Sequence, residues 1–122
     1  MKSSILILLA LITLTSCSQE SKNIYMSESN LASQIEYADK VKNKVVFEGE
    51  QYKMILFAMR SDQLLKPHSA PVDAPLLMIE GSAKVTIGNK EQIVVAGDMI
   101  TLPKDILHGV YPQTDCKFLL AK

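Results

Sequence analysis

The side chains best suited to chemistry in this chain are His68 and His108, its only two histidines in 122 residues. A neutral imidazole can accept a proton, bind a metal ion or form hydrogen bonds to a small molecule. Cys116 has no histidine near it in the sequence, so we expect it to be a small strand residue and not a nucleophile. The chain contains no GxSxG, P-loop or GxGxxG motif, which leaves the histidines as the starting point for a function.

Residues 1–16 have the features of an export signal. Lys2 supplies a positive charge, and an almost unbroken apolar run follows from residue 5 to residue 14. A helix that crosses a membrane needs about 20 apolar residues, so this run is too short to serve as a membrane anchor. Its length does fit the apolar core of a signal peptide.

The run ends in Leu14-Thr15-Ser16-Cys17. This resembles the lipobox of bacterial lipoproteins, in which an apolar residue and two small residues precede a cysteine that is acylated and becomes the new N-terminus. The resemblance implies lipidation at Cys17 and a membrane-anchored protein of the cell envelope that faces the periplasm. Ser18 in place of Asp implies the outer membrane if the organism is Gram-negative. The alternative is an ordinary signal peptide with a chance cysteine.

The remaining residues suffice for one small domain behind a tether. Residues 17–44 are mostly polar and predict a tether whose latter part holds an edge strand or a short helix. Acidic and basic residues balance to a formal net charge of zero, and no basic block interrupts their mixture. The chain also lacks Trp, so we expect no nucleic-acid partner.

From residue 45 to residue 122, short apolar segments alternate with Gly, Pro and Asn, which favour turns. The longest segment is YKMILFAM at residues 52–59, and the others lie at 45–47, 76–80, 83–87, 92–95, 99–102, 109–111 and 117–121. Many short strands with turns between them predict an all-β sandwich or barrel. A barrel is favoured because closure hides the sheet edges that no predicted helix covers.

Two motifs make this barrel resemble the cupins. Pro67-His68-Ser69-Ala70-Pro71-Val72-Asp73 with Leu77-Met78-Ile79-Glu80-Gly81 is similar to the first cupin motif, and Gly97-Asp98, Pro103 and His108-Gly109 are similar to the second. Both occur in order, with a predicted hairpin between them. The resemblance to small single-domain cupins of the cupin-2 kind implies a double-stranded β-helix, or jelly roll, with an interior pocket.

The cupin resemblance also implies a set of metal ligands. His68 matches the first histidine, Asp73 matches the carboxylate but is one methylene shorter, and His108 matches the histidine of the second motif. Ala70 stands where a further histidine is expected, so the implied site for a divalent metal ion of unknown identity is degenerate. Two histidines and a carboxylate are the ligands of non-haem iron sites with open positions. Alternatively, the histidines are neutral pocket residues and Asp73 caps the turn between Pro71 and Pro75.

Three functions stay open, because one fold hosts many activities. The first is a module that binds a small molecule through His68, Asp73, Leu77, Ile79 and His108. The second is a metal-dependent enzyme, such as a dioxygenase or an isomerase of a small oxygenated substrate. The third is a structural or interaction lipoprotein with a vestigial pocket.

The YKMILFAM segment is apolar on both faces of its predicted strand. A strand that is buried on both sides needs a cover beyond the core of its own barrel. We therefore expect the domain to form a homodimer.

Overall fold

The computed structural model describes residues 30–122, and the predicted export signal, Cys17 and most of the predicted tether lie outside the described residues. The elements of this part are η1(Leu31–Gln34), β1(Lys42–Glu48), β2(Lys53–Met59), β3(Leu65–His68), β4(Ala74–Glu80), β5(Ser82–Ile87), β6(Lys90–Val95), β7(Met99–Leu102), β8(His108–Pro112) and β9(Cys116–Ala121). No helix within these residues is long and apolar enough to cross a membrane.

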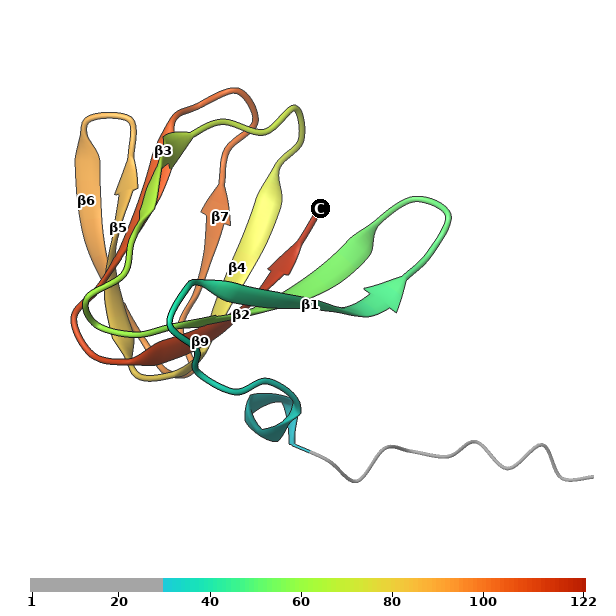
Figure 1. The fold of residues 1–122 in the computed structure, drawn as a ribbon. Coiled ribbons are helices and arrows are strands. Elements are labelled where there is room, and N and C mark those ends of the chain that lie inside the picture. Colours follow the sequence, from blue (N-terminus) through green and yellow to red (C-terminus); the bar gives the residue numbers. More distant parts are fainter. Residues whose placement is uncertain (1–29) are drawn as a thin grey trace, which may run out of the picture.

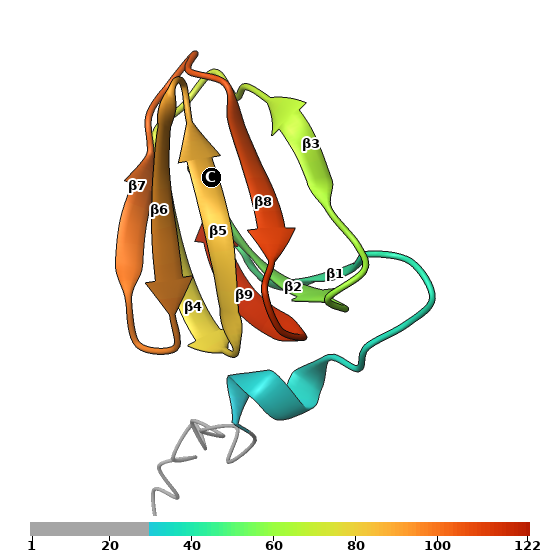
Figure 2. The ribbon, with the colours of Figure 1, turned by 90° about the vertical axis from the view of Figure 1, so that its left-hand side faces the viewer.

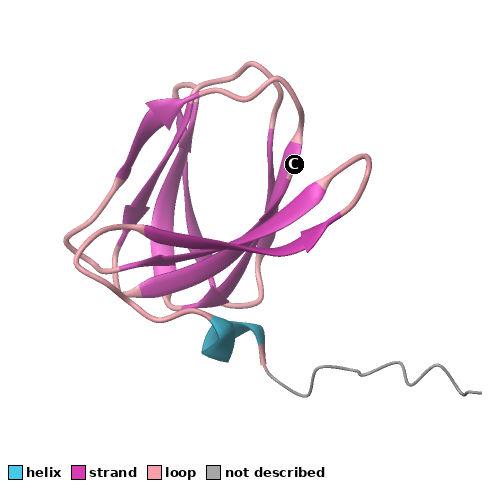
Figure 3. Cartoon of the chain, turned by 45° about the vertical axis from the view of Figure 1, so that its right-hand side comes forward, coloured by secondary structure: helices cyan, strands magenta, loops and turns pink. Residues whose placement is uncertain are grey.

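The strands form two antiparallel sheets that face each other. One sheet has the order β1-β2-β9-β4-β7 and the other has the order β3-β8-β5-β6 (Figure 1). Figure 2 shows the second sheet from its outer side, with β3 at one edge and β6 at the other. The loops that follow β3 and β7 lie together at one end of the barrel, opposite the short helix η1 (Figure 3). The all-β barrel predicted from the sequence is confirmed.

The interior is filled by the alternate residues of each strand that point inward. Its fully buried side chains come from both sheets and include Leu76, Met78, Val85, Val110 and Phe118. The rings of Phe57 and Phe118 stack with centroids 4.9 Å apart. Because successive side chains of a strand point to opposite faces, this one row of each strand builds the core.

Strand β3 was missed in the sequence because it contains Pro67 and a lysine where an apolar residue would be expected. Proline removes one hydrogen-bond donor, so it is tolerated in a strand at the edge of a sheet. β3 lies at such an edge and pairs only with β8, and its register shifts between Leu65 and His68.

Strand β1 starts at Lys42, three residues before the apolar segment at 45–47. The preceding segment contains η1, whose first turn is capped by the side chain of Asn30, which accepts a hydrogen bond from Ala32 N at 2.8 Å. The latter part of the predicted tether thus holds both a short helix and the start of an edge strand.

This segment covers part of the outer face of the five-stranded sheet. Ile35 is buried there against Leu56, Ala58 and Leu119, and Leu31 and Tyr37 pack around it. The second apolar face of the YKMILFAM strand is therefore covered in part by the chain itself.

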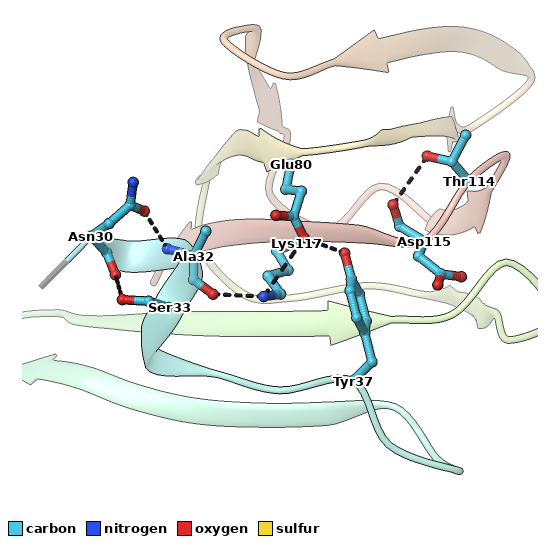
Figure 4. A network of polar contacts seen from close by, with 8 residues as sticks. All are labelled: Asn30, Ala32, Ser33, Tyr37, Glu80, Thr114, Asp115 and Lys117. Carbon is cyan, nitrogen blue, oxygen red and sulfur yellow. Dashed lines mark hydrogen bonds and ion pairs between the residues drawn. The ribbon is translucent and has the colours of Figure 1, made fainter.

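A buried lysine fastens the segment to the sheet (Figure 4). Lys117 Nζ donates a hydrogen bond to Ala32 O at 2.6 Å and lies 3.6 Å from Glu80 Oε2. The Tyr37 hydroxyl donates to the same Glu80 oxygen, and the lysine ammonium lies 4.9 Å from the centre of the tyrosine ring. Burial and then the Glu80 carboxylate raise the pKa of Tyr37, so its hydroxyl stays protonated and donates.

Candidate functional site

Two neighbouring strands bring the histidines together. His68 on β3 and His108 on β8 are direct partners in the antiparallel register. Side chains that face each other in this way lie on the same side of the sheet. Their ring centroids are 4.6 Å apart in an edge-to-face arrangement, so residues forty positions apart in the sequence form one pair.

Each ring is oriented by a main-chain carbonyl. His68 Nδ1 lies 2.8 Å from Lys66 O, and His108 Nδ1 lies 3.2 Å from Ile106 O. A carbonyl oxygen only accepts hydrogen bonds, which assigns the hydrogen of each neutral ring to Nδ1. Each Nε2 atom is then left as a base, an acceptor or a metal ligand.

His108 is the buried member of the pair, with 4% of its surface exposed. Burial lowers the pKa of His108 and the charge of His68 lowers it further, while the hydrogen bond to Ile106 acts in the opposite direction. The charge of Lys122 lowers the same pKa. His108 is therefore neutral near pH 7.

The close approach of β3 to β8 depends on Gly109, which follows the buried histidine. A Cβ atom at this position would lie 3.2 Å from Leu65 O and 3.1 Å from the Thr86 side chain. A side chain here would therefore require Thr86 or the β3 main chain at Leu65 to give way by a few tenths of an ångström. The glycine of the His108-Gly109 motif thus has a structural role in forming the pair.

The two histidines line a pocket of about 330 Å³ at the mouth of the barrel. Its other lining residues are Lys53, Ser69, Ala70, Pro71, Val72, Ala74, Leu120 and Lys122. A smaller chamber of about 80 Å³ shares both histidines, Leu120 and Lys122, and its remaining walls are core side chains such as Phe57, Leu76 and Phe118. The site is therefore an apolar hollow with a few basic groups at one end.

Asp73 does not join the histidines as the motif implied. Its exposed carboxylate accepts a hydrogen bond from Lys104 N at 2.7 Å, and Asp105 N donates to Ala70 O at 2.8 Å. These bonds tie the loop after β3 to the loop after β7. Within residues 30–122, no group of three His, Cys, Asp or Glu side chains is arranged to hold a metal ion.

The implied set of His68, Asp73 and His108 is thus corrected to a pair of histidines. The short Asp73 side chain is engaged by the neighbouring loop, and Ala70 lines the pocket without supplying a ligand. Among residues 30–122, the side chains near the histidines do not fit a metal site with three protein ligands. The suggested cap on the turn between Pro71 and Pro75 is also replaced, because the partner of Asp73 lies in another loop.

Leu77 and Ile79, which were predicted to bind the ligand, lie on the opposite side of β4. Both pack on the outer face with Ile35 and Leu119, while Leu76 and Met78 point into the barrel. A shift of one residue in the assumed phase exchanges the two faces of a strand. β4 is apolar on both faces, so the sequence could not settle this phase.

Lys53 and Lys122 were missed as pocket residues. Lys53 lies two positions before the buried Ile55 on β2, and Lys122 lies two positions after the buried Leu120 on β9. Period-two alternation along these strands was the signal that could have found them.

Solved structures support the fold assignment. A cupin 2 conserved barrel domain protein from Leptotrichia buccalis is 30% identical with a TM-score of 0.72, over 76% of this chain and 46% of that one. An RmlC-like cupin protein from Desulfovibrio desulfuricans is 25% identical and has a TM-score of 0.69, and the alignment covers 80% of this chain and 95% of that chain. A cupin superfamily protein from Desulfitobacterium hafniense is 20% identical and has a TM-score of 0.71, and the alignment covers 75% of this chain and 85% of that chain.

No family model and no curated protein matches the chain. The structural similarities show that the described part of the chain has the double-stranded β-helix fold of the cupins.

Proposed function

We propose that this chain is an envelope lipoprotein whose cupin domain binds a small molecule in the pocket beside His68 and His108. The observation that carries the proposal is the pocket itself, with its volume of about 330 Å³ and largely apolar walls. Ligand sites are concave and mostly apolar, with a few convergent polar groups that orient the ligand.

The histidine pair supplies that orientation. With both Nδ1–H groups bonded to main-chain carbonyls, the Nε2 atoms accept hydrogen bonds from a hydroxyl or N–H of the ligand. Because Asp73 is bonded elsewhere and Ala70 is no ligand, the pocket favours binding over metal-assisted catalysis.

A single tryptophan placed at the rim tests this proposal, because the chain has no Trp of its own. Ser69 is exposed and lines the pocket, so the fluorescence of Ser69→Trp should respond to a bound molecule. Ser61→Trp is the matched control, because Ser61 is also exposed but lies in the turn after β2 and outside the pocket. A library of small metabolites should include compounds that change the emission of the first variant only. If no compound separates the two variants, the pocket is vestigial and the barrel is a structural or interaction domain.

A metal-dependent enzyme is the second candidate, and one observation favours it. Histidines that bind metals commonly donate a hydrogen bond from the N–H of their other ring nitrogen to a carbonyl or carboxylate, and both histidines here lie against a main-chain carbonyl in this way. Calorimetric titration with zinc, nickel, manganese and ferrous ions separates the candidates. The binding module predicts no stoichiometric uptake, whereas uptake that is lost in His108→Ala would support the enzyme.

We further propose that the domain forms a homodimer through the part of the outer face of the five-stranded sheet that the segment around η1 does not cover. An apolar groove there is lined by Met54, Pro75, Leu77, Met99, Leu119 and Ala121. Met99 is 67% exposed and lies on β7, an edge strand of its sheet, so a second copy can cover it. Sedimentation should show a dimer for the wild type and a monomer for Met99→Lys. Val95→Lys on the other sheet is the control, and a monomeric wild type at micromolar concentration would contradict the assembly.

A further inference from the structure

The pocket holds a second pair of basic side chains opposite the histidines. Lys53 N donates to Lys122 O at 2.8 Å, and Lys122 N donates to Lys53 O at 3.0 Å. Two residues that exchange both main-chain hydrogen bonds are direct partners in an antiparallel ladder. Their side chains therefore lie on the same face of the five-stranded sheet.

That face is the inner one. Lys53 is in phase with Phe57 on β2, and Lys122 is in phase with Phe118 and Leu120 on β9, all of which contribute to the interior core. The two lysines thus stand where the inward rows of β2 and β9 reach the barrel mouth. Both line the pocket together with His68 and His108.

The lysine charges have no partner within residues 30–122. The ion pairs of this part join Arg60 to Asp39, Lys84 to Glu91 and Lys117 to Glu80, and no Asp or Glu side chain lines the pocket. Glu48 and Glu50 border an adjoining cleft that shares both lysines, but neither is ion-paired with them.

Like charges that lie directly opposite each other on neighbouring strands destabilise the sheet unless an opposite charge binds between them. The charge of Lys122 reaches the histidines, since it contributes to lowering the pKa of His108. A lysine pair that no Asp or Glu side chain neutralises, at the entrance of an apolar hollow, has the charge to attract an anion. A singly charged anion suits it best, because an anion of higher charge is more costly to remove from water.

We propose that the ligand of this pocket is a small organic carboxylate, held by Lys53 and Lys122. Its apolar body fills the chamber walled by Phe57, Leu76 and Phe118, and a hydroxyl or N–H on that body reaches the histidine pair. This inference rests on the proposed binding function and specifies its ligand class.

Three molecules of one shape test the charge preference directly. Benzoate is an anion, benzamide is neutral and benzamidine is a cation, and each has the same planar apolar ring. The full chain, purified in a non-ionic detergent, is titrated with each compound at neutral pH and followed by calorimetry. Benzoate should bind on the order of tenfold more tightly than benzamide, and benzamidine should bind least. Acetate, which lacks the apolar body, should bind more weakly than benzoate.

Substitution of the lysines locates the effect. Lys53→Gln and Lys122→Gln should each weaken benzoate binding several-fold, and the double variant should bind benzoate and benzamide alike. Lys90→Gln is the matched control, because Lys90 is an exposed lysine on β6 that does not line the pocket. It should leave the affinity for benzoate unchanged.

Two results would overturn the inference. Equal affinity of the wild type for the three aromatic compounds, or benzoate binding that survives in the double lysine variant, would show that the lysines do not select the ligand. The fluorescence of Ser69→Trp would still report ligands of other chemistry, so failure of the anion preference is distinguishable from failure of the proposed function.

Discussion

At the scale of single residues, the type of His108 and its position in the motif together identified it as a site residue. The motif resemblance identified it, and the structure places it opposite His68 with their rings 4.6 Å apart. Asp73 was identified by the same reasoning, yet its carboxylate is bonded to Lys104 N. Sequence motifs preserve the strand positions of side chains, but they do not reveal which loop atoms compete for a side-chain oxygen.

The lowered pKa of His108 predicts a pH dependence of stability. The unfolded state binds a proton near pH 6.5, whereas the folded state resists it because His108 is buried and lies near the charges of His68 and Lys122. Its contribution is therefore complete above about pH 6.5 and is lost as the pH falls toward the lower folded value. Each pH unit over which only the unfolded state is protonated costs about 1.4 kcal/mol.

Urea unfolding at pH values on either side of 6.5 measures this effect. The wild type should lose more stability on acidification than His108→Gln, which cannot titrate at this position. Equal losses in the two proteins would show that His108 does not resist protonation.

At the scale of elements, most strands were predictable and the phase of one was not. Alternation and turn residues located eight of the nine strands of residues 30–122, whereas β3 was obscured by Pro67. For β4, an apolar residue stands at nearly every position, so the pattern carried no information about which face is buried. Leu77 and Ile79 can lie on the outer face because η1 and the segment after it give them apolar neighbours there.

The turn at Gly81 gives a prediction about stability. Gly81 has a φ of +72°, and a Cβ atom there would lie only 2.0 Å from Asp115 O. Gly81→Ala should therefore destabilise the domain by more than about 2 kcal/mol, because backbone strain and a clash with main-chain atoms act together. Gly97→Ala is the control, since Gly97 has a φ of +95° but no atom within 4 Å of the added Cβ. It should cost about 1 kcal/mol in thermal or urea unfolding, and equal costs would contradict this account.

The attachment of η1 gives a second prediction at this scale. Lys117→Met removes the hydrogen bond to Ala32 O and the ion pair with Glu80, so the domain should lose about 2 kcal/mol of stability. Hydrogen exchange in residues 30–41 should also become faster than in the wild type. Lys44→Met is the control, because exposed Lys44 contacts Gln34 O at 3.4 Å and should matter little. Unchanged exchange in Lys117→Met would show that this lysine does not hold the segment.

At the scale of the whole molecule, the sequence predicted the cupin barrel because two motifs and many short strands agreed. The lysine pair could not be inferred from motifs, since Lys53 and Lys122 lie near opposite ends of the barrel sequence and meet only through the pairing of β2 with β9. The size of the pocket likewise depends on how side chains from both sheets pack, which period-two patterns do not specify.

The proposed anchor gives a prediction for the complete chain. Cys17→Ser removes the thiol that would accept the lipid, so the protein should appear in the soluble fraction or remain unprocessed. Cell fractionation followed by mass spectrometry of the N-terminus measures both outcomes. Cys116→Ser is the matched control, because Cys116 is buried in the barrel and should not affect membrane attachment. A processed Cys17→Ser protein that still sediments with membranes would contradict the lipoprotein proposal.

The central claim is that the hollow between the histidine pair and the lysine pair is the functional site. Its most direct test is a two-dimensional ¹H–¹⁵N spectrum of the wild-type chain titrated with a mixture of small organic carboxylates. We predict that the amide shifts concentrate at residues 68–74, 108–110 and 120–122, together with Lys53, which surround the pocket. Shifts that concentrate instead on the outer face around Met54, Leu77 and Met99, or no shifts at all, would contradict the claim.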